Sequence, residues 1–158
     1  MKRNLILYLS LTLLLGACKK DKSDSNSADN SWTFKGTNYT AATVVYVDAG
    51  SQANLSAGAT GATATSADGL VFLFTTPPTS NGQMLITDSL DPNTVVVSVS
   101  KLSGSSTTFY SNAETNVQAS VNVNGGKVSV SFPGSIWLHN MVNYSDSAQL
   151  SVGTITQQ

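Results

Sequence analysis

The sequence predicts an all-β fold, and three observations support this prediction. First, β-branched Val and Thr dominate the patterned segments, and these side chains suit a pleated strand surface. Second, apolar and polar residues alternate over several short stretches, which is the period of a half-buried strand. Third, no stretch repeats apolar residues with helical spacing over three turns. We expect an antiparallel two-sheet sandwich of about nine or ten short strands, with a small β-barrel as the alternative.

The first elements of the expected domain are a hairpin and a buried strand. In residues 32–41, WTFKGTNYTA, the Trp and the Phe share one face and the Lys-Gly pair marks a tight turn. Residues 43–47, TVVYV, are apolar enough for a strand that is buried on much of both faces. Residues 52–65 are rich in Ala, Thr and Gly with little pattern, so an edge strand and a long loop both fit them.

The middle of the chain adds further strands separated by turn residues. Residues 69–76, GLVFLFTT, are the most hydrophobic, and the following Pro-Pro pair ends the strand because proline cannot donate to a ladder. Residues 83–87, QMLIT, precede the turn sequence DSLDPN at 88–93. Strands are then expected at TVVVSVS, residues 94–100, and at TTFYS, residues 107–111.

The clearest local pattern is a hairpin within residues 116–134, NVQASVNVNGGKVSVSFPG. Valines alternate with polar residues on both sides of Asn-Gly-Gly, and a two-residue turn requires positive φ, which Asn-Gly and Gly-Gly both allow. With Asn-Gly as the turn Val128 faces Val121, and with Gly-Gly it faces Val123, so both registers pair valines. Residues 148–156, AQLSVGTIT, add a last strand with a bulge where the glycine interrupts the alternation.

The amino-terminal end has the features of a secretory signal peptide. Lys2 and Arg3 precede an apolar run from Leu5 to Leu15. As a helix this run would measure about 16 Å, which is too short for a hydrocarbon core of about 30 Å. A charged start, a short apolar run and small residues after it are typical of a signal peptide. The chain contains one cysteine, Cys18, so no intramolecular disulfide can form.

The motif LGAC, formed by Leu15, Gly16, Ala17 and Cys18, resembles the lipobox of bacterial lipoproteins. The resemblance implies that residues 1–17 are removed as a signal peptide and that Cys18 carries a diacylglycerol and a further acyl chain such as palmitate. Two or three chains would anchor the protein durably in a membrane. The start CKKDKSD also resembles lipoproteins of the Bacteroidota. This implies a bacterial outer membrane location, on its periplasmic or its surface-exposed side.

A tether and one domain are expected after the lipid anchor. Residues 18–31 are almost entirely polar and cannot bury a core, so they should form a disordered tether. Residues 32–158 then make a single β-domain of ordinary size. A formal net charge of −1 gives no basic surface for nucleic acid. We expect a monomer that contacts the membrane through the lipid on Cys18.

Residues for catalysis or metal binding are scarce. His139 is the only histidine, no G-x-S-x-G motif supplies a nucleophile, and a structural role for this residue is the preferred interpretation. Asp88, Asp91 and Asn93 offer oxygens to calcium, but these are also the residues that a turn requires. Glu114 is the only Glu available to a carboxylate pair. We therefore predict no enzyme, no cofactor and no metal site.

The aromatic residues remain as candidates for ligand contact, because sugar rings stack on exposed aromatic faces. The candidates are Trp32, Tyr110, Trp137 and Tyr144. Core packing is the usual role of such residues, but in SIWLHN, residues 135–140, Ile136 and Leu138 would share the strand face opposite Trp137. We predict a binding module for a glycan, a protein or another envelope component, with Trp137 and Tyr144 as contacts. The alternative is a lipocalin-like carrier of a small apolar ligand.

Overall fold

The computed structural model describes residues 30–112 and 115–158, and within them it contains strands, turns and no helix. The strands are β1 (Ser31–Phe34), β2 (Thr37–Asp48), β3 (Ala53–Ala59), β4 (Ser66–Phe74), β5 (Gly82–Ile86), β6 (Thr94–Ser103), β7 (Ser106–Asn112), β8 (Gln118–Asn124), β9 (Lys127–Ser131), β10 (Ser135–Asn140), β11 (Ser147–Val152) and β12 (Ile155–Thr156). The all-β prediction is confirmed.

The strands close into a barrel. Going round it, the neighbours are β6, β4, β3, β2, β1, β11, β10 and β7, and β7 pairs again with β6. The predicted two-sheet sandwich is therefore wrong, and the structure matches the small barrel that was the alternative. Pairing within this ring is antiparallel, as expected.

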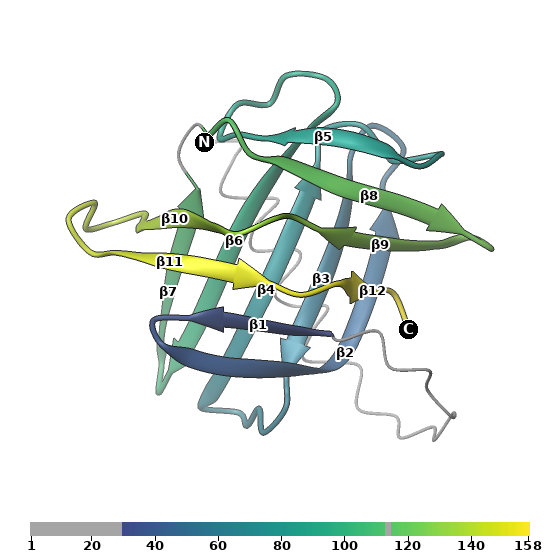
Figure 1. The fold of residues 1–158 in the computed structure, drawn as a ribbon. Coiled ribbons are helices and arrows are strands. Elements are labelled where there is room, and N and C mark those ends of the chain that lie inside the picture. Colours follow the sequence, from purple (N-terminus) through teal and green to yellow (C-terminus); the bar gives the residue numbers. More distant parts are fainter. Residues whose placement is uncertain (1–29, 113–114) are drawn as a thin grey trace.

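The remaining strands extend one side of the barrel. β5 runs parallel to β6 and pairs with β8, which pairs with β9, which pairs with β12. Figure 1 shows a front layer of β1, β11, β12, β9, β10, β8 and β5 that crosses steeply over a back layer of β2, β3, β4, β6 and β7. After β12, the Gln158 amide donates to the Val44 carbonyl at 3.2 Å, which ties this end of the chain to β2.

The path of β2 explains why the layers join into a barrel. Its first residues, 37–40, pair with β1, and from Ala41 onward it pairs with β3. The register shifts between Ala41 and Thr43, and such a bulge bends a strand and increases its twist. One long strand therefore passes from the front layer to the back layer. In a sandwich of two separate sheets, the hydrogen-bonded pairing between strands would be interrupted at this corner.

Both predicted tight turns are present. In the first hairpin Phe34 pairs with Thr37, and the turn residues Lys35 and Gly36 have φ of 50° and 73°. In the hairpin of β8 and β9, Val123 pairs with Val128. The Gly-Gly turn is therefore the register adopted, one of the two that the sequence allowed.

The segment 52–65 forms neither an edge strand nor a long loop. Half of it is β3, which lies between β2 and β4 in the middle of the back layer. Its inward residues are Ala53, Leu55, Ala57 and Ala59, and each is buried. Small alanines alternate with polar residues as a strand requires, but they produce a weak hydrophobic pattern. Packing against the large side chains of β4 supplies the hydrophobic contact that the small alanines of β3 do not provide by themselves.

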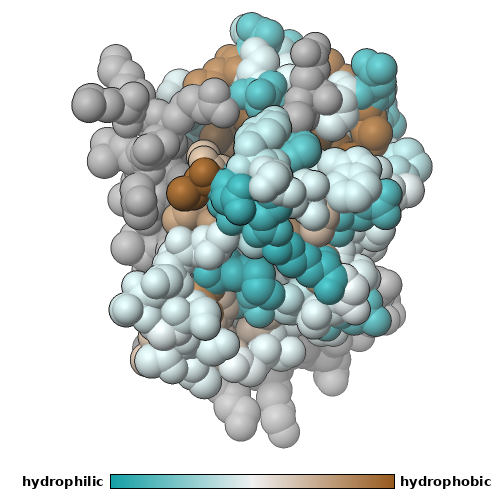
Figure 2. Space-filling model, turned by 90° about the vertical axis from the view of Figure 1, so that its left-hand side faces the viewer, coloured by the Kyte–Doolittle hydropathy of each residue, from teal (hydrophilic) through white to brown (hydrophobic). Residues whose placement is uncertain are grey.

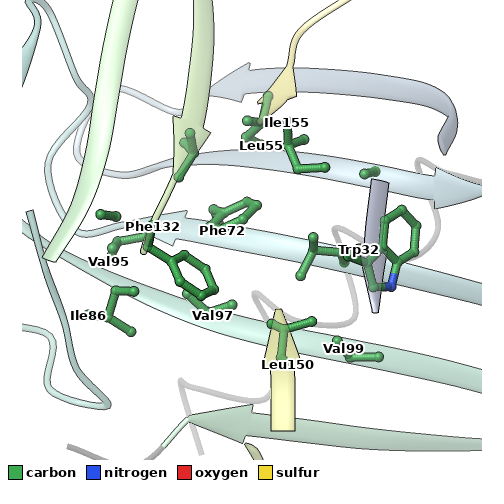
Figure 3. Close-up of a cluster of buried hydrophobic side chains, with 14 of the residues drawn as sticks. Trp32, Leu55, Phe72, Ile86, Val95, Val97, Val99, Phe132, Leu150 and Ile155 are labelled. Atoms are coloured by element: carbon green, nitrogen blue, oxygen red, sulfur yellow. The ribbon is translucent and has the colours of Figure 1, made fainter. Parts of the chain in front are cut away.

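Side chains from both layers fill the space between them. Figure 3 shows Phe72 of the back layer close to Phe132 of the front layer, with Trp32 and Leu150 beside them. Phe72 and Leu150 are 0% exposed, and Trp32 is 2% exposed. Burial of each such side chain contributes about 1.5–3 kcal/mol to stability. Because the interior is occupied by the protein's own side chains, the core lends no support to the carrier alternative.

Candidate functional site

The strand β10 presents one buried and one exposed face. Ile136 and Leu138 point into the core and are 3% and 0% exposed. Trp137 lies on the opposite face and is 52% exposed. The alternation that made this residue a candidate in the sequence is therefore confirmed. His139 shares the outer face with Trp137, because residues two apart on a strand point to the same side.

Tyr144, in the loop between β10 and β11, covers His139. The two rings are parallel within 2°, their centroids are 4.4 Å apart, and Tyr144 is 66% exposed. We call Trp137, His139 and Tyr144 the aromatic platform. The loop projects from the left of the barrel in Figure 1, and Figure 2 views that side, where pale and brown side chains lie among teal ones. The structure thus places Trp137 on the outer face of β10 and Tyr144 in the loop that follows this strand, where it stacks on His139.

Backbone hydrogen bonds fix the shape of this loop. The Asn140 side-chain oxygen accepts from the amides of Val142 and Asn143 at 2.9 and 3.2 Å. The Asn140 amide donates to the Asp146 carbonyl at 2.8 Å, and the Met141 amide donates to Phe109 on β7 at 2.9 Å. A loop already held in one shape loses less conformational entropy when a ligand binds to it.

A charged cluster secures the far end of the loop. Lys35 donates to Asp146 at 2.6 Å and to the Tyr110 hydroxyl at 2.8 Å, and Tyr110 donates to Asp146 at 2.7 Å. Hydrogen bonds from Lys35, Tyr110 and Asn140 lower the pKa of Asp146 to about 2. Burial lowers the pKa of Lys35, but its bonds to Asp146 and Tyr110 outweigh this effect and leave that pKa above its usual value. Lys35 and Asp146 are therefore both charged at neutral pH.

Exposed apolar side chains lie beside the platform residues in the same loop. Val142 is 98% exposed and Met141 is 46% exposed. Single exposed apolar residues are common on protein surfaces, but a run of them next to exposed aromatic rings indicates a contact surface.

The other candidate residues from the sequence lie in the core or form turns. Trp32 and Tyr110 are 2% and 5% exposed, so they belong to the core and cannot offer a face to a ligand. Asp91 accepts a hydrogen bond from Ser89 at 2.6 Å within its turn. Asn93 has a φ of 61°, the left-handed conformation that turns require. In the described ranges, no three His, Cys, Asp or Glu side chains gather as a metal site would need.

The sequence did not indicate two features of the structure, one beside the platform and one on another surface. Lys35 and Asp146 are 111 positions apart, and no local pattern signals their contact. The second missed feature is an open groove of about 510 Å³ at the end of the β8–β9 hairpin, lined by Asn81, Asn122, Val123, Asn124, Lys127, Ser129 and Thr156. The lipobox residues Leu15, Gly16, Ala17 and Cys18, and Glu114, lie outside the described residues.

The fold and this surface define a small closed β-barrel with a core of buried apolar side chains and an exposed aromatic platform. Residues 30–112 and 115–158 include no helix long and apolar enough to cross a bilayer. Comparisons with protein-family models, with curated proteins and with solved structures found no match.

Proposed function

We propose that this protein is a membrane-anchored, non-enzymatic binding module whose aromatic platform contacts a glycan. One observation carries the proposal. Trp137 and Tyr144 are both more than half exposed, and Tyr144 is held parallel to His139 by a loop whose backbone is itself hydrogen-bonded. Large exposed aromatic side chains cost solvation free energy unless a ligand covers them.

The geometry suits a sugar ring. The faces of Trp and Tyr rings are apolar and flat, and the C–H face of a pyranose packs against such surfaces. Tyr and Trp also lose little conformational entropy on binding, because each has only two side-chain torsions. The stacking of Tyr144 on His139 and the hydrogen bonds of Asn140 reduce that cost further.

Membrane attachment is the second part of the proposal and is supported by the LGAC motif that ends at Cys18. The polar segment from Lys19 to Ser31 would then separate the barrel from the lipid. A flexible chain of about 13 residues has a root-mean-square span of roughly 20 Å. A platform at that distance from an outer membrane is placed to meet glycans or proteins in the surrounding envelope or medium.

A glycan array tests the proposal. The wild-type protein should bind a defined set of glycans, and Trp137→Ala and Tyr144→Ala should each weaken that binding by about tenfold or more, which equals about 1.4 kcal/mol. Leu90→Ala is the matched control, because Leu90 is 48% exposed but lies in the turn between β5 and β6.

The melting temperature separates binding from stability in this test. All three variants should melt close to the wild type, since each truncates a side chain that is at least 48% exposed. Unchanged glycan binding in both platform variants would contradict the proposal. If the wild type binds an envelope protein and no glycan, and the platform variants lose that binding, the platform contacts a protein partner instead.

A further inference from the structure

A second surface of the barrel carries a different chemistry from the aromatic platform. β5, β8, β9 and β12 lie next to one another in the front layer (Figure 1). Across them Asn122 pairs with Ser129, and Ser129 pairs with Thr156, so that polar side chains form one row. Gly82 pairs with Val121 in an antiparallel register. The preceding residue, Asn81, therefore lies next to Asn122 at the end of the same row. This row is the floor of the open groove, which we call the amide groove.

The amide side chains in the groove have unused hydrogen-bonding capacity. The Asn81 side-chain oxygen accepts from the Val123 amide at 2.7 Å, which positions the side chain and leaves its NH₂ group without a partner among the described residues. Asn122 and Asn124 are exposed, and their side chains make no hydrogen bond within the described part of the chain. Each amide provides two donors and one acceptor, the combination that recognises sugar hydroxyls.

One unpaired positive charge lies at the rim of the groove. Lys35 and Lys101 each contact a carboxylate, at 2.6 Å from Asp146 and 3.1 Å from Asp68. Lys127 pairs with Asn124 across the end of the hairpin and forms no ion pair with any described residue. Of the three lysines in the described residues, Lys127 therefore lies beside three amides rather than beside an acidic side chain.

From these observations we infer that the amide groove is a saccharide-binding site for an acidic glycan, in which Lys127 pairs with a sugar carboxylate. Asn81, Asn122 and Asn124 supply hydrogen bonds to the hydroxyl groups of the same and the neighbouring sugar. Ser129 and Thr156 complete the polar floor. The site uses no residue of the aromatic platform and does not depend on the function proposed for that surface.

Calorimetric titration of the full-length protein with hexagalacturonate tests the inference, with maltohexaose as the neutral probe of equal length. Hexagalacturonate should bind more tightly and should lose affinity as salt is added. Lys127→Gln should weaken its binding about tenfold, and Lys127→Arg should restore most of it. Asn122→Ala should weaken it about fivefold. Gln83→Ala is the matched control, because it removes an exposed amide of the same layer that lies outside the groove.

Two further results decide between the sites. Trp137→Ala should leave hexagalacturonate binding unchanged, so failure of the aromatic platform and failure of the amide groove are distinguishable. In an NMR titration, the side-chain NH₂ signals of Asn81, Asn122 and Asn124 should shift. No binding of hexagalacturonate, equal binding of both probes, or full affinity in Lys127→Gln would each overturn the inference.

Discussion

Replacing Gly125 with valine tests how the β8–β9 hairpin is built and how it holds the amide groove. Gly125 and Gly126 form the turn with φ of 58° and 79°. Left-handed backbone costs an L-residue roughly 1–2 kcal/mol, and a β-branched residue is among the least tolerant. A Cβ at Gly125 would meet no atom within 4 Å, so the Cβ itself causes no steric overlap. The expected loss is therefore about 1–2 kcal/mol from backbone strain alone.

Urea unfolding followed by circular dichroism measures this loss. With a slope of about 1–3 kcal/mol per molar urea, the midpoint should fall by about 1 M while the slope stays constant. Gly125→Asn should cost much less than Gly125→Val, because asparagine adopts left-handed φ readily and is favoured in this turn. Gly82→Val is the control, since Gly82 lies in β5 without positive φ and a Cβ there also meets nothing within 4 Å.

The comparison of these variants tests whether positive φ at Gly125 causes the loss of stability. If Gly125→Val unfolds at the wild-type midpoint, or loses no more than Gly82→Val, the turn does not need left-handed backbone at Gly125. If Gly125→Asn loses as much as Gly125→Val, side-chain size and not φ is the cause. Where the turn is strained, Asn124 and Lys127 should also move, because they flank it as the last pair of the hairpin. Weaker hexagalacturonate binding in Gly125→Val would report that movement.

Two further predictions concern the charged cluster and the anchor. The pKa of Asp146 is lowered from 3.8 to about 2, so its stabilising effect should be complete above about pH 4 and should disappear as the pH falls to about 2. The difference in unfolding free energy between wild type and Asp146→Asn should shrink across that range, and a constant difference would argue against the cluster. Cys18→Ser should abolish lipid labelling, and mass spectrometry of the native protein should find a chain that begins at Cys18 and carries two or three acyl chains. A free thiol on a chain that still begins at Met1 would contradict the anchor.

Local sequence patterns identified most strands but not how they assemble. Alternation in β8, β9 and β10 marks which residues face inward, and the structure buries Val121, Val130 and Leu138 as expected. The same alternation fits a sandwich and a barrel, because both have one inner and one outer face. The difference lies in the pairing of β7 with β10 and in the bulge at Ala41. These pairings join segments that are distant in the chain, so no local sequence pattern predicts them.

Some residues of the candidate site could be predicted from the sequence and others could not. Trp137 was identifiable from its neighbours Ile136 and Leu138, because a strand with two core residues must place the one between them outside. Tyr144 lies in a loop without a pattern, and its stacking on His139 depends on the contacts of Asn140 and Asp146. The amide groove gives no sequence signal, since Asn81 and Thr156 meet Asn122 only after the sheet has formed.

The fluorescence of Trp137 reports directly whether a bound glycan covers the aromatic platform. The described residues include two tryptophans, Trp32 in the core and Trp137 on the surface, so the variant Trp32→Phe leaves Trp137 as the reporter. Acrylamide should quench this reporter efficiently in the free protein, because the ring is 52% exposed. At saturation with the glycan that the array identifies, quenching should fall sharply, since a sugar ring then covers the indole. Equal quenching with and without the bound glycan would contradict the account, because the ligand would lie away from the aromatic platform.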